Sequence, residues 1–224
     1  MKAVSRPASA QAMKQAHTVS RAQPNCRQVF VLFQGQAGRM MMDPMQFLRE
    51  ARITDRNLIM VADRSRRFYQ QGLSPEIPNI PSMIQWLQKC LDKMQHAADV
   101  MCVGSSSGAY AAVLCGYLLK VREVWAFAPP TDLTTVTEDQ ELDPALIDPR
   151  YSDLQQLLRV SNGVTKYNIF YNESCDYDRA AALRLQDCEG VSLHSQGGTG
   201  HGVILHMAKL GALPGLLPSF AGLK

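Results

Sequence analysis

Hydrophobic residues in this 224-residue chain gather in short continuous runs, each followed by turn residues and then by a helical pattern. Continuous apolar runs of this length are typical of strands that helices bury on both faces, as in a parallel sheet. Six strands are predicted in this way, at residues 28–33, 57–62, 100–103, 123–128, 167–171 and 191–194. The alternation of strands and helices predicts an α/β fold with a mostly parallel six-stranded sheet and helices on both faces.

Helices are predicted between and after these strands, at residues 45–51, 83–94, 109–119, 154–160, 179–185 and 203–210. The first of them is marked by Asp43 and Pro44, an N-cap residue followed by a proline at the first helical position. No internal repeat or interdomain linker interrupts the pattern, so residues 28–224 are predicted to form a single domain. Within it, residues 131–160 lack a strand pattern and are a candidate small cap.

The first 27 residues contain five basic residues, no acidic residue and no apolar periodicity. Such a segment buries too little apolar surface to offset its ordering entropy, so a flexible extension is predicted, whose deletion leaves stability unchanged. A solvated tail and an organelle transit peptide are both compatible with this composition. No apolar stretch approaches the roughly 18 residues of a membrane span, and no secretory signal is evident, which favours a cytoplasmic protein.

Composition and charge narrow the range of partners. The formal net charge of +3 is too small to indicate nucleic-acid binding, and 46% of the residues are hydrophobic, as in a packed globular protein. The six cysteines are scattered without the spacing of a metal site and are predicted to be reduced. We therefore expect neither a nucleic acid nor a metal ion as a partner.

The strand at residues 100–103 runs into a G-x-S-x-G sequence centred on Ser106 and then into a helix. This sequence between a strand and a helix is typical of a nucleophile elbow, a tight turn that lifts its central serine above the sheet. Ser106 is therefore the candidate nucleophile, and Gly104 and Gly108 leave room for the turn. The N–H of Ser107 opens the helix, where free backbone donors and the helix dipole favour a developing oxyanion.

On this motif and on the residues downstream of it, the chain resembles the α/β-hydrolases over most of residues 28–220. The resemblance implies a catalytic triad in the order serine, acid, histidine. His201, in a glycine-rich loop after the last strand, matches the position of the histidine. The loop after the fifth strand offers two acids, and Asp176 is favoured because Asp178 is equally well explained as a helix N-cap. Asp132, after the fourth strand, is a third alternative.

The resemblance also implies a second oxyanion donor in the loop after the first predicted strand, and the backbone N–H of Gln36 is assigned to it. A basic loop after the second strand contains Arg64 and Arg67, which are candidate ligands for an anionic group of the substrate. A solvated loop that Phe68 and Tyr69 pack against the domain explains the same residues equally well.

These assignments predict a serine hydrolase that cleaves an ester or thioester of a small-molecule acyl substrate through Ser106, His201 and Asp176. No cofactor is implied. In an acyltransferase or a cyclising thioesterase, the same triad passes the acyl group to an alcohol or amine instead of water. A non-catalytic binding or scaffold protein is a further alternative, because fold does not determine function.

Overall fold

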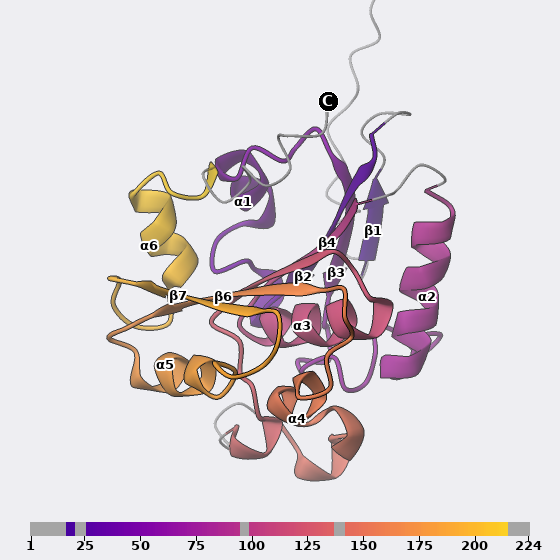
Figure 1. Ribbon diagram of the computed structural model, residues 1–224. Helices are drawn as coiled ribbons and strands as arrows, with labels where there is room; N and C mark the ends of the chain where they lie inside the picture. The colour runs from indigo at the N-terminus through magenta and orange to yellow at the C-terminus, as the bar shows by residue number, and fades with distance from the viewer. Residues whose placement is uncertain (1–16, 21–25, 95–98, 137–141, 215–224) are drawn as a thin grey trace, which may run out of the picture.

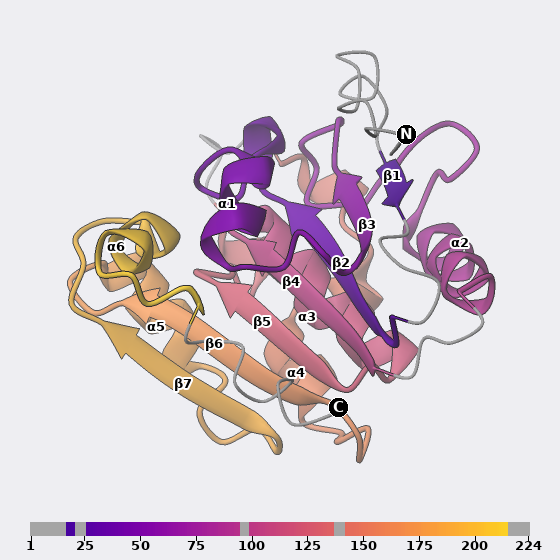
Figure 2. The same ribbon diagram turned by 90° about the horizontal axis from the view of Figure 1, so that it is seen from above.

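The computed structural model describes residues 17–20, 26–94, 99–136 and 142–214. Within these residues, seven strands form one sheet with the order β1-β3-β2-β4-β5-β6-β7. The strands are β1 (His17–Ser20), β2 (Gln28–Gln34), β3 (Asn57–Ala62), β4 (Asp99–Ser105), β5 (Glu123–Phe127), β6 (Lys166–Asn172) and β7 (Val191–Gln196). Figure 2 shows them side by side: β2 to β7 run parallel, whereas β1 pairs antiparallel with β3.

The six parallel strands are the six predicted from the sequence, and the predicted fold class is confirmed. Burial on both faces explains their continuous apolar composition, since Val29 to Phe33 of β2 are at most 1% exposed. Because these strands are parallel, the loops that follow their carboxyl ends lie along one edge of the sheet. Ligands of open α/β sheets bind at this edge.

β1 lies in the segment that the sequence predicts to be an extension. Its four residues pair with β3, from His17 opposite Val61 to Ser20 opposite Leu58. Strand pairing through backbone hydrogen bonds needs no apolar periodicity, which explains why the hydrophobic pattern did not reveal this strand. The rest of the predicted extension up to residue 25, and residues 215–224 of the predicted domain, lie outside the described residues.

Helices cover both faces of the sheet (Figure 1). They are α1 (Pro44–Glu50), α2 (Ile80–Asp92), α3 (Ser107–Leu119), α4 (Leu154–Leu158), α5 (Asp176–Leu183) and α6 (Val203–Lys209), with 3₁₀ turns at Gln36–Gly38, Leu133–Thr135, Pro144–Leu146 and Pro149–Tyr151. α1 and α6 lie on one face, where Phe47 and Ile204 join a buried cluster with Phe30 of β2. α2, α3 and α5 lie on the other face. Among the described residues, no helix has the length and apolar character of a membrane span.

α3 is the central helix of the second face. Its residues from Ser107 to Gly116 are all buried, so this part of the helix has no polar side. Helices that are apolar all round belong to the protein interior. Here α3 packs across β2, β4 and β5, which fixes the position of its first turn above the sheet.

The cap segment, residues 131–160, follows β5 and precedes β6 in the chain, and its described residues lie on the same side of the sheet as α3 and α5 (Figure 1). Its described part is a series of 3₁₀ turns followed by α4. Arg184, after α5, pairs with Asp132 at 2.9 Å and with Asp153 at 2.8 Å, which holds the two ends of the turns together. Three of its acids, Glu138, Asp139 and Glu141, lie outside the described residues.

Deletion of residues 1–20 removes β1 and exposes the outer edge of β3. We expect this variant to lose roughly 2 kcal/mol of unfolding free energy, since each backbone hydrogen bond contributes a net 0.5–1.5 kcal/mol or so. Urea denaturation followed by circular dichroism measures the change. Deletion of residues 1–16 is the matched control, because it leaves β1 in place. Equal midpoints for the two variants would show that β1 does not stabilise the domain.

Candidate active site

Ser106 occupies a sharp turn between the last residue of β4 and the first residue of α3. Its backbone has φ 54° and ψ −126°, which non-glycine residues rarely adopt and which recurs at functional sites. The N–H of Ser106 donates to the carbonyl of Phe127 at the end of β5, at 2.9 Å. The neighbouring serines Ser105 and Ser107 are each 1% exposed, whereas Ser106 is only half-buried, so it is the accessible hydroxyl of the three.

Two glycines permit this turn because backbone atoms occupy the space of their missing side chains. A Cβ on Gly104 would lie 2.1 Å from the carbonyl oxygen of Gly108. A Cβ on Gly108 would lie 2.1 Å from the carbonyl oxygen of Phe33 in β2. The elbow is therefore built on close contact between the start of α3 and the ends of β4 and β2, as the G-x-S-x-G sequence predicts.

The two assigned oxyanion donors lie at the starts of a 3₁₀ turn and of a helix. Gln36 begins the 3₁₀ turn after β2, and Ser107 begins α3, so neither N–H has an acceptor within its own helix. The N–H groups of Gly35 and Gly38 are engaged, with the carbonyls of Arg39 (2.7 Å) and Gly35 (3.1 Å). Among the described residues, the N–H groups of Gln36 and Ser107 make no backbone hydrogen bond, so both remain available to a ligand.

The candidate histidine is paired with a buried carboxylate. His201 Nδ1 lies 2.8 Å and 3.0 Å from the two carboxylate oxygens of Asp178, whose side chain is 1% exposed. The His201 side chain is 46% exposed. Because Asp178 engages Nδ1, Nε2 is the ring nitrogen available to a nucleophile. Within the described residues, no hydrogen bond joins His201 to Ser106.

Asp176, the favoured acid in the sequence analysis, does not contact His201. Its side chain is 90% exposed and pairs with Arg179 at 2.9 Å. The sequence predicted a helix from Arg179, whereas α5 begins at Asp176. Both acids therefore lie in the first helical turn, where residues two positions apart are rotated by about 200° around the helix axis and so point to nearly opposite sides. Asp178 faces the domain and His201, and Asp176 faces solvent.

Asp132, the third candidate acid, is engaged in the cap segment. Its carboxylate accepts hydrogen bonds from the N–H and the hydroxyl of Thr134, at 2.9 Å and 2.6 Å, and pairs with Arg184. Partial burial raises the pKa of Asp132, but the Thr134 hydrogen bonds and the Arg184 charge outweigh burial, and the pKa is lowered. Asp132 therefore caps a 3₁₀ turn and supports the cap segment.

Two side chains that the sequence analysis missed hold the loop before His201. Asn172 ends β6, and its Nδ2 donates to the carbonyl of Gly200 at 2.8 Å. Ser174 Oγ donates to the carbonyl of Gly198 at 2.7 Å. Asn172 is fully buried. A polar residue at the carboxyl end of a buried strand was the available signal, because a buried amide needs a hydrogen-bond partner.

Arg64 and Arg67 lie in the loop after β3, with Arg64 exposed and Arg67 half-buried. Since β2 lies between β3 and β4, this loop is at the same edge of the sheet as Ser106 but two strands away. Their binding of an anionic substrate group remains a prediction.

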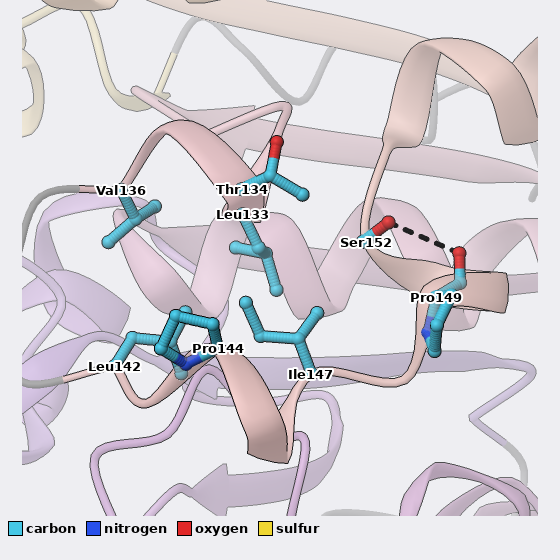
Figure 3. Close-up of a pocket in the computed structure, with 8 residues that line it drawn as sticks. All are labelled: Leu133, Thr134, Val136, Leu142, Pro144, Ile147, Pro149 and Ser152. Atoms are coloured by element: carbon cyan, nitrogen blue, oxygen red, sulfur yellow. Dashed lines mark hydrogen bonds between the residues drawn. The ribbon is translucent and has the colours of Figure 1, made fainter.

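The cap segment contains a cavity of about 200 Å³. Figure 3 shows its mostly apolar lining, which consists of Leu133, Thr134, Val136, Leu142, Pro144, Ile147, Pro149 and Ser152. Within the part of the chain that the structure describes, no three His, Cys, Asp or Glu side chains form a group suited to a metal ion.

Comparison with known proteins identifies the fold. No protein-family model matches the sequence, and no curated protein matches it. Est1E from Butyrivibrio proteoclasticus has a similar structure, with a TM-score of 0.60 and 10% identity over 89% of this chain and 91% of that chain. An alpha-beta serine hydrolase homologue from Coxiella burnetii matches with a TM-score of 0.55 and 14% identity over 90% of each chain.

An S-formylglutathione hydrolase from Agrobacterium tumefaciens also matches, with a TM-score of 0.56 and 14% identity over 84% of this chain and 83% of that chain. At these identities the similarity establishes the fold and not the reaction. The fold is that of the α/β-hydrolases, in agreement with the resemblance noted in the sequence.

Gly108→Ala tests the close contact on which the elbow depends. The added methyl group would lie 2.1 Å from the Phe33 carbonyl, so α3 or β2 must shift. We expect a loss of about 1–3 kcal/mol of unfolding free energy, the usual cost of forcing an extra methyl group into a packed core. Gly197→Ala is the matched control, because only its chain neighbours lie within 4 Å of the place that its methyl group would take. Similar denaturation midpoints for the two variants would contradict this account.

Proposed function

We propose that this protein is a serine esterase that hydrolyses carboxylic esters through Ser106, His201 and Asp178. The observation that carries the proposal is the buried carboxylate of Asp178 on His201 Nδ1, at the sheet edge where Ser106 occupies a strained, accessible turn. A buried acid on this nitrogen fixes the imidazole tautomer and stabilises the imidazolium, as a catalytic triad requires. The α/β-hydrolase fold and its hydrolase neighbours support this assignment.

In the proposed reaction, His201 Nε2 takes the proton of Ser106 Oγ while this oxygen attacks the ester carbonyl. The N–H groups of Gln36 and Ser107 donate to the oxyanion of the tetrahedral intermediate. The intermediate collapses as His201 returns the proton to the leaving alcohol, which gives an acyl ester on Ser106. Water, activated by the same histidine, then releases the carboxylic acid and restores Ser106.

An ester is the proposed substrate because the alcohol is a better leaving group than an amine. Amide cleavage needs a well-placed proton donor to the leaving amine. His201 is the one proton donor in the proposed set of site residues, and none of the other proposed residues would assist a poorer leaving group, so the ester is the proposed substrate.

Ser106→Ala tests the nucleophile. We expect the variant to keep its fold and to lose hydrolysis of 4-nitrophenyl acetate by a factor on the order of 10⁶ in kcat, as in other serine triads. Ser105→Ala is the matched control, because the Ser105 hydroxyl is buried and donates weakly, at 3.3 Å, to the Arg39 carbonyl. Activity of Ser106→Ala close to that of the wild type would refute the proposed nucleophile.

Asp178→Asn and Asp176→Asn together test the acid. Asparagine at 178 keeps the size of the side chain but favours the wrong imidazole tautomer, so kcat is expected to fall by a factor on the order of 10⁴. Asp176→Asn removes one exposed ion pair and should change kcat less than about twofold. Steady-state or stopped-flow hydrolysis of the same ester measures kcat for both variants. The opposite pattern would return the role to Asp176.

A further inference from the structure

The loop between β3 and α2 combines strained backbone with deep burial at residues that the proposed mechanism does not use. Arg66, Phe68 and Tyr69 have φ angles of 56°, 55° and 62°, in the left-handed region that disfavours bulky side chains. Phe68 and Tyr69 are also 1% and 0% exposed. Such backbone persists only where surrounding contacts enforce it, and it recurs near functional sites.

Tyr69 is held on three sides. Its N–H donates to the Asp63 carboxylate at 2.9 Å, and its ring meets Phe33 edge-on, with centroids 5.8 Å apart. Its hydroxyl lies 2.7 Å from the carbonyl oxygen of Gln34 and 3.1 Å from that of Val61. Burial, followed by the charge of Asp63, raises the pKa of Tyr69, so the phenol stays protonated and donates to these carbonyls.

The Gln34 carbonyl belongs to the peptide unit between Gln34 and Gly35, which leads directly into the 3₁₀ turn that begins at Gln36. The same unit carries the N–H of Gly35, which donates to the Arg39 carbonyl at 2.7 Å. This peptide unit is therefore fixed at both its oxygen and its nitrogen, and the next peptide unit carries the Gln36 N–H. The two peptide units are planar and are joined through Gly35, so a shift of the first unit, which Tyr69 holds, would move the Gln36 N–H in the second.

We infer that Tyr69 is a positioning residue for the oxyanion hole: its hydroxyl fixes the Gln34 carbonyl and thereby aims the N–H of Gln36. The inference rests on the proposed function. The strained loop would then serve the site, because the left-handed backbone at Phe68 and Tyr69 brings the phenol within hydrogen-bond distance of the end of β2.

The adjacent residue shows that the loop has independent anchors. Gln70 Oε1 accepts the N–H of Asp148 at 2.9 Å, and Gln70 Nε2 donates to the Tyr110 hydroxyl at 2.9 Å. The Tyr110 hydroxyl in turn donates to the carbonyl of Tyr151. These bonds tie the loop to α3 and to the cap segment. Removal of the Tyr69 hydroxyl alone should therefore leave the loop in place.

Tyr69→Phe, which keeps the ring against Phe33, is the test. Complete removal of an oxyanion donor costs about 10²–10³ in kcat, and misaiming one should cost less. We expect kcat for 4-nitrophenyl acetate to fall about 10-fold with KM changed less than twofold, and labelling of Ser106 by a fluorophosphonate to slow in parallel. Tyr167→Phe is the matched control: Tyr167 is buried and its hydroxyl accepts from Asn162, near the amino end of β6.

A merely structural role for Tyr69 predicts a different result, in which both variants lose thermal stability and neither loses kcat. Hydrogen exchange supplies a readout that does not need activity. The N–H groups of Gly35 and Gly38 should exchange faster in Tyr69→Phe than in the wild type or in Tyr167→Phe. Unchanged exchange at both glycines, or a kcat within twofold of the wild type, overturns the inference.

The outcomes also separate this inference from the proposed function. A wild type that neither hydrolyses the ester nor takes the fluorophosphonate would contradict the esterase, while exchange at Gly35 and Gly38 would still decide whether Tyr69 holds this 3₁₀ turn. If Tyr69→Phe does not fold, Asp63→Asn replaces it. That variant keeps the phenol but weakens the anchor of the Tyr69 N–H, and it should shift the same measurements in the same direction by a smaller factor.

Discussion

The candidate site depends on the close backbone contact between α3 and the strands beneath it. Because Gly104 and Gly108 lack side chains, the first turn of α3 lies directly against Gly104 in β4 and against the Phe33 carbonyl in β2. This approach forces Ser106 into a strained conformation, at a cost on the order of 1–3 kcal/mol, which the buried helix and the bond to Phe127 must offset. The same contact places the start of α3 beside the loop after β2, so Ser106 and the two proposed oxyanion donors depend on one packing contact.

The remaining groups reach this edge because parallel strands end on the same side of the sheet. β6 leads into the loop and helix that carry Asp178, and β7 leads into the loop that carries His201. Asn172 and Ser174 join these two loops by hydrogen bonds to glycine carbonyls. The histidine loop is thus held by polar contacts, whereas the elbow is held by backbone packing. This difference suits the proposed roles of His201 as the base and of Ser106 as the nucleophile.

Much of this arrangement was predictable from the sequence, because its signals are local or periodic. The strand Asn57–Ala62 was predicted at its observed bounds from apolar continuity alone, and the elbow was predicted from two glycines around a serine. The acid that pairs with His201 was not predicted. Asp178 was interpreted as an N-cap residue, whereas α5 begins at Asp176, three residues earlier than predicted, and Asp178 lies inside the helix. β1 depends on long-range backbone pairing with β3, and the contact between Tyr69 and Gln34 depends on the direction of a side chain. Neither feature produces a periodic pattern in the sequence.

Covalent labelling shows whether Ser106 is an activated nucleophile without requiring knowledge of the natural substrate. Folded wild-type protein is treated with a fluorophosphonate, and the modified residue is mapped by peptide mass spectrometry. We expect a single adduct on Ser106, formed much more slowly when His201 is replaced by alanine, because the proposed base activates the serine hydroxyl. An unmodified protein, or an adduct on Ser105 or Ser107 with Ser106 untouched, would contradict the proposed nucleophile.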